Sequence, residues 1–117
     1  SSEQTFQAIA LQPVVIQIDL KEVKSKKIAY ATVELPESVE FYSKKFPNIR
    51  EQKSLKVNLE KKMEEFDFYS VVIQANHSGI KNIKIKFYNS DQKQVSEKQM
   101  RIDFTMQSKA KVGTYES

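Results

Sequence analysis

Apolar residues recur at every second position in several short stretches of the chain. The clearest is Pro13 to Leu20, in which Val14, Ile16, Ile18 and Leu20 alternate with mostly polar residues. Successive side chains of a β-strand point to opposite faces of a sheet, so this spacing predicts strands with one buried face. The other stretches with this period are 28–35, 55–59, 68–75, 80–88 and 100–106.

Turn-forming residues separate these stretches. Asn76-His77-Ser78-Gly79 lies between two of them and predicts a β-hairpin. Asn89-Ser90-Asp91 predicts a second turn, before the last strand. An opening segment, Phe6 to Leu11, and a short piece, Val39 to Tyr42, bring the predicted total to seven or eight strands.

Two stretches are compatible with a short helix. Pro36 to Phe46 has Val39, Tyr42 and Phe46 at helix-like spacing behind a proline, which suits a first helical position, so a helix is the alternative to a strand there. Glu60 to Glu65 is a place for one further turn of helix. Neither changes the predicted class, which is all-β: an antiparallel β-sandwich of seven to eight strands.

The length of 117 residues fits one domain with one hydrophobic core. We expect a single β-sandwich domain over residues 1–107 and a frayed tail over residues 108–117, where the alternation is lost. No apolar run approaches the roughly 18 residues that span a bilayer. Membrane attachment is therefore expected only through a segment outside this chain.

Residues that carry catalysis, bind metals or hold nucleotides are scarce. The chain has no cysteine, a single histidine (His77) and only two glycines, Gly79 and Gly113. A Ser-His-Asp triad needs an oriented histidine, and His77 lies in a predicted turn, where we expect it to be exposed. Zinc sites and glycine-rich phosphate loops need more ligands or glycines than are present. We expect no catalytic, cofactor-binding or metal-binding residues, and a protein that is not an enzyme.

Two further patterns have plain explanations. Glu37 and Glu40 lie in a polar connecting stretch, where solvated carboxylates are more common than a paired acid and base. Asn76-His77-Ser78 matches the N-glycosylation acceptor pattern, but one such match is expected by chance in a chain with this many serines and asparagines. Neither pattern predicts a function.

The net charge of +4 permits weak attraction to acidic partners. The candidate partner-binding residues are Lys81, Lys84, Lys86 and Tyr88. Lys84 and Lys86 share one strand face with Tyr88, and a basic face with an aromatic residue is what single-stranded nucleic acid or an anionic surface would use. We favour a solvated outer sheet face instead, because arginines and stacking aromatics are sparse. Nucleic acid is therefore not the expected partner.

One segment resembles a known family. Ala31-Thr32-Val33-Glu34-Leu35-Pro36-Glu37-Ser38-Val39-Glu40-Phe41 is similar to the TV-LPEGVE segment of bacterial extracytoplasmic immunoglobulin-like domains. With its neighbouring strands it resembles the C-terminal β-sandwich domain of membrane-anchored zinc-finger anti-sigma factors. The resemblance implies an immunoglobulin-like fold, a location in the bacterial cell envelope (extracytoplasmic or periplasmic) and a protein-interaction or sensing role within a larger protein.

A protein partner is accordingly the expected one. A structural spacer domain, and a weak binder of nucleic acid or anionic surfaces through the basic sheet face, are the alternatives. The sequence leaves the oligomeric state open.

Overall fold

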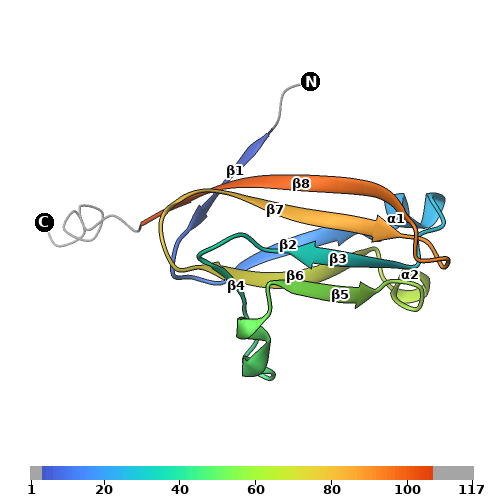
Figure 1. The fold of residues 1–117 in the computed structure, drawn as a ribbon, viewed down its shortest axis with the longest axis horizontal. Coiled ribbons are helices and arrows are strands. Elements are labelled where there is room, and N and C mark those ends of the chain that lie inside the picture. Colours follow the sequence, from blue (N-terminus) through green and yellow to red (C-terminus); the bar gives the residue numbers. More distant parts are fainter. Residues whose placement is uncertain (1–3, 107–117) are drawn as a thin grey trace, which may run out of the picture.

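A computed structural model of the chain describes residues 4–106, among which strands are the predominant element (Figure 1). Eight strands lie within these residues: β1 (Thr5–Ile9), β2 (Val14–Asp19), β3 (Tyr30–Glu34), β4 (Val39–Phe41), β5 (Ser54–Asn58), β6 (Phe68–Ala75), β7 (Gly79–Tyr88) and β8 (Gln94–Thr105). The short helices are α1 (Leu20–Ser25), the 3-10 helix η1 (Pro47–Glu51) and α2 (Lys62–Glu65). The predicted all-β class and number of strands are confirmed. The predicted tail, residues 108–117, lies outside the described residues.

The strands form two sheets. One has five strands in the order β1-β8-β7-β3-β5, and the other has three in the order β2-β6-β4. Neighbouring strands are antiparallel except β1 and β8, which pair in parallel, with Thr5 opposite Arg101 and Ile9 opposite Thr105. The prediction of a wholly antiparallel arrangement is wrong at this pair. No tight turn joins β1 to β8, so nothing local fixes their relative direction.

One apolar core lies between the two sheets. The alternate residues that the sequence pattern assigned to one face are the buried ones, for example Val33 on β3, Ile73 on β6, Ile85 on β7 and Phe104 on β8. No polar or charged residue among the described ones is buried. The hydrophobic effect therefore accounts for how the sheets associate, without help from buried ion pairs.

The turn at 76–79 joins the two sheets and does not close a hairpin. Strand β6, before the turn, pairs with β2 and β4, whereas β7, after it, pairs with β8 and β3. The predicted hairpin is wrong here because turn residues show that the chain reverses but not which sheet the next strand joins. The hairpin is β7–β8, and in its turn the Asn89 side-chain oxygen accepts a hydrogen bond from the Lys93 N–H at 3.0 Å.

Helix α1 follows β2 directly. The Asp19 carboxylate caps it by accepting a hydrogen bond from the Lys21 N–H at 2.9 Å, and Leu20 and Val23 bury its inner face. The strand predicted to run to Leu20 thus ends at Asp19. A helix of six residues offers only this cap and one apolar pair as sequence signals, and the alternating pattern of the preceding strand runs up to Leu20 and conceals both.

The segment 36–46 contains a strand, and the helical alternative is wrong. Pro36 and Glu37 lead into a turn in which the Val39 N–H donates to the Pro36 carbonyl at 3.3 Å. Ser38 in this turn has φ 71°, in the left-handed region. Val39–Phe41 then pairs with β6. The turn of helix expected within Glu60 to Glu65 is confirmed as α2.

The conformation of Ser38 predicts a stabilising substitution. A left-handed residue that is not glycine costs roughly 1 kcal/mol, so Ser38→Gly should raise the free energy of unfolding by about that amount. Urea unfolding of the variant measures the change. Ser78→Gly is the matched control, since Ser78 has no positive φ, and it should not stabilise. Equal effects of the two substitutions would contradict the explanation.

Candidate functional site

The four predicted partner-binding residues all lie on β7 but do not form one surface. Lys84, Lys86 and Tyr88 lie on the outer face of the five-stranded sheet, as predicted. Lys81 has the opposite parity and shares the inward face with the buried Ile83. Lys81 therefore does not share the face of the other three residues.

The outer-face residues already have partners within the sheet. The rings of Tyr30 and Tyr88 are stacked, with centroids 4.9 Å apart and 9° between their planes, and the Lys56 ammonium lies 4.3 Å from the Tyr30 ring centroid. Lys86 Nζ lies 3.1 Å from a Glu34 carboxylate oxygen, and this hydrogen bond raises the pKa of Lys86. Two aromatic faces and two cations are thus occupied, which leaves little to stack or neutralise a nucleic acid.

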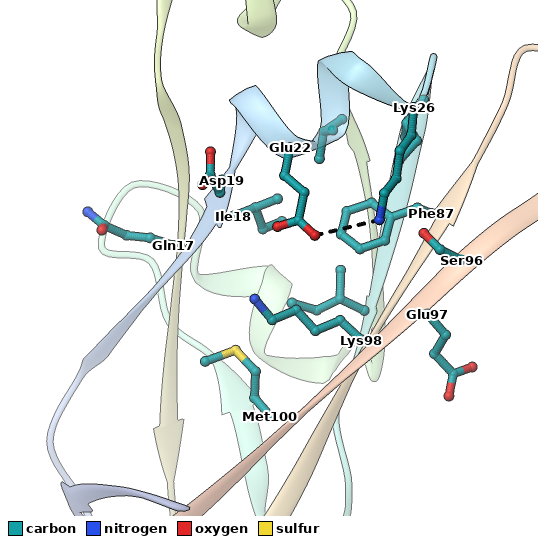
Figure 2. A pocket seen from close by; sticks show the side chains of 13 residues that line it. Gln17, Ile18, Asp19, Glu22, Lys26, Phe87, Ser96, Glu97, Lys98 and Met100 are labelled. Carbon is teal, nitrogen blue, oxygen red and sulfur yellow. Dashed lines mark ion pairs between the residues drawn. The ribbon is translucent and has the colours of Figure 1, made fainter. Parts of the chain in front are cut away.

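A cavity of about 270 Å³ opens between β2 of the smaller sheet and β8 of the larger one (Figure 2). Helix α1 contributes Glu22 and Val23 to its wall, and Lys26 follows directly after the helix. Glu22 and Lys26 form an ion pair of 3.6 Å. The buried residues that line it are all apolar: Ile18, Val23, Ile28, Ile85 and Phe87. Its polar lining residues are exposed or half-buried. An apolar floor beneath a polar mouth is typical of a binding site.

Both strands beside the cavity have a free edge. β2 pairs only with β6. β8 pairs with β7 along its length but with β1 only from Arg101 to Thr105, five of its twelve residues. The outer edge of the remaining seven, Gln94–Met100, has no strand partner within residues 4–106. We call this seven-residue segment the free β8 edge.

The direction of the backbone groups along this edge follows from the hydrogen bonds at its ends. The Ala10 N–H donates to the Thr105 carbonyl at 2.8 Å, on the side away from β7. Because strand residues direct their N–H and C=O alternately to the two sides, Glu97 and Gln99 also direct theirs away from β7. At the other end of the edge, the Ala29 N–H donates to the Tyr88 carbonyl, so Tyr88 directs its backbone groups toward β3. The alternation that follows along β7 and its partner β8 again directs the backbone groups of Glu97 and Gln99 away from β7. Unpaired backbone donors and acceptors thus lie beside the cavity.

A second polar cluster surrounds Glu40 on β4. Asn76 Nδ2 donates to its carboxylate at 2.8 Å, and Arg50 Nε donates to it at 3.2 Å. The hydrogen bond from Asn76, followed by that from Arg50, lowers the pKa of Glu40. The expectation that Glu40 is merely solvated is wrong, because the fold brings residues from two other segments to it. This cluster holds η1 and the turn after β6 against β4, which is a structural role, and it explains Asn76 without a glycan.

Metal-binding groupings are not found among residues 4–106. No three His, Cys, Asp or Glu side chains there are placed to hold a metal ion. His77 is exposed in its turn, as predicted. The cavity between β2 and β8 was missed by sequence reasoning because it is formed by residues from three distant segments, none of which carries a recognisable motif.

No protein-family model, curated protein or solved structure matches this chain. No helix within the described range is long and apolar enough to cross a membrane. The resemblance to an anti-sigma-factor domain, and the envelope location that it implies, therefore stay predictions.

The lowered pKa of Glu40 predicts a pH-dependent stability. A carboxyl group with a depressed folded-state pKa stabilises the fold above its unfolded pKa, here taken as 4.5, and this contribution is lost as the pH falls through the folded value. Glu40→Gln should lower the free energy of unfolding by up to about 1 kcal/mol at neutral pH, since the pair is partly solvated. Below pH 4.5 the difference should shrink.

Urea unfolding at neutral and acidic pH measures this. Glu37→Gln is the control, because Glu37 is exposed and forms no ion pair with the described residues. A Glu40→Gln effect of the same size at both pH values would contradict the assignment.

Proposed function

We propose that this chain is a non-catalytic protein-interaction module that binds a segment of another protein in the cavity between β2 and β8. The observation that carries the proposal is the coincidence of an apolar floor with a free strand edge. The apolar floor alone, or the free edge alone, is explained as an ordinary solvated part of the surface. Together they offer hydrophobic contact and backbone hydrogen bonds to the same ligand.

The choice of a binding role over catalysis rests on the chemistry of the described residues. General acid–base catalysis uses side chains whose pKa values burial and neighbours have tuned toward the working pH. The pKa of Glu40 is lowered and that of Lys86 is raised, and each shift moves the group's pKa further from neutrality. Both residues lie away from the cavity and have structural partners. This favours binding.

We further propose that the fold is immunoglobulin-like. In that fold the strands A, B, E and D form one sheet and C, F and G the other. The order β2-β6-β4 corresponds to B-E-D, and β3-β7-β8 corresponds to C-F-G. The departures are β5, which is an addition beside β3, and β1, which pairs with β8 in the other sheet. The resemblance of residues 31–41 supports the same fold, and it supports a place in the bacterial envelope as part of a larger protein.

Two other roles compete with this proposal. A spacer domain needs no cavity, and a nucleic-acid or anionic-surface binder would use the outer face with Lys84, Lys86 and Tyr88. The internal pairing of Tyr88 and Lys86 with Tyr30 and Glu34 disfavours the second of these roles. The cavity argues against a spacer domain only if a ligand binds in it, so the experiment must test binding.

A random peptide library selected on the immobilised full chain tests the proposal. We expect enriched peptides whose binding persists at high salt and weakens at least about tenfold when Ser96→Trp fills the cavity. Lys84→Ala, on the outer face, is the matched control and should bind as the unmodified chain does.

The alternatives predict other outcomes. Peptides that are acidic, salt-sensitive and lost in Lys84→Ala would overturn the proposal in favour of the basic face. No enrichment of peptides at physiological salt or at high salt would favour the spacer domain.

A further inference from the structure

We propose that the partner binds by strand addition: an extended peptide segment of another protein pairs with the free β8 edge and becomes an additional strand of the larger sheet. This inference rests on the proposed function and names the mode of binding and the chemistry of the ligand. The free edge supplies main-chain hydrogen bonds, and the cavity beside it receives alternate side chains.

The same edge of β8 already accepts a strand elsewhere. From Arg101 to Thr105 it pairs with β1, and the pairing ends where the free segment begins. At the other end, β8 begins at Gln94, directly after the β7–β8 turn. A guest strand would therefore lie in line with β1 and span about seven residues, the length of Gln94–Met100.

The side chains of the edge define the guest's pattern. Apart from the residue beside Lys98, inward-facing residues of the guest would point into the cavity, whose apolar floor includes Ile85 and Phe87, so they should be apolar. Lys98, at the cavity mouth, favours an acidic neighbour on that face. Glu97, on the opposite face of β8, favours a basic neighbour. The expected ligand alternates apolar and polar residues and carries both charges.

The same charges disfavour the two central registers in which a second copy of this chain would pair with the edge. Two free β8 edges paired antiparallel about Glu97 would bring the two Glu97 side chains together. Pairing about Lys98 would bring the two Lys98 side chains together. Like charges directly opposite each other destabilise a strand pair. A chemically different strand avoids both conflicts.

The direction of the backbone groups permits a selective test. Proline at position 97 removes an N–H that points to the free edge and leaves the β7–β8 hydrogen bonds in place. Glu97→Pro should weaken the binding of a selected peptide at least about tenfold. Glu97→Ala removes the same side chain but keeps the N–H, so the loss should be about threefold at most.

A second measurement needs no variant of the protein. Two versions of one selected peptide are N-methylated at alternate residues, in the two possible phases. If the peptide pairs as a strand, methylation in the phase that faces β8 should abolish binding, and methylation in the other phase should preserve it.

Each outcome decides between the proposals. Strand addition would be overturned if both methylated peptides bound equally well and if Glu97→Pro bound the peptide as tightly as the unmodified chain does. The cavity would then be a binding site of another kind. Failure of every peptide to bind the unmodified chain would overturn both proposals. A dimer that sedimentation detects in the absence of peptide, and that Glu97→Pro dissociates, would identify a second copy as the occupant and overturn the proposed ligand.

Discussion

The long antiparallel pairing of β7 with β8 is the interaction on which the rest of this structure depends. It runs from Gly79 opposite Phe104 to Tyr88 opposite Gln94, and each of the two strands also pairs with another. β7 also pairs with β3, which in turn pairs with β5, and β8 also pairs with β1. Inward side chains of the pair, such as Ile85 and Phe104, belong to the core that the smaller sheet covers. Without this ladder neither the larger sheet nor the core could form.

The proposed binding site is a consequence of unequal strand lengths. β8 has twelve residues and β1 has five, so β1 cannot cover the whole outer edge of β8. The smaller sheet has only three strands, and its edge strand β2 meets the uncovered part of β8 across the cavity. Lys98 and Glu97 on β8 resemble the charges with which natural sheets avoid unwanted pairing. These charges disfavour pairing of the edge with an identical edge in the registers that bring them together. They leave the edge available to a strand of complementary charge.

Local pattern predicted much of the fold, because burial on one face imposes a period of two that residues such as Val33, Ile73 and Ile85 display directly. Features that depend on which strands meet were not predictable in this way. The turn ending at Gly79 has the same residues whether it closes a hairpin or connects two sheets. The parallel pairing of β1 depends on contacts across nearly the whole chain. Helix α1 is too short to show a helical period.

The candidate site was less predictable than the fold. Lys84, Lys86 and Tyr88 were placed correctly on one face, yet the pairing that occupies them comes from Tyr30 and Glu34 on another strand. The cavity joins β2, α1, β7 and β8, so no single stretch signals it. A free edge is a property of the assembled sheet and leaves no trace in the sequence.

Amide hydrogen exchange of the free chain, residue by residue along β8, tests the central claim most directly. If the edge is free and its phase is as described, the N–H groups of Ser96 and Lys98, which face β7, should exchange at least about tenfold more slowly than those of Glu97 and Gln99. Uniformly slow exchange at all four positions would mean that something already covers the edge. The opposite alternation would mean that the backbone faces the other way, and either result would contradict the account.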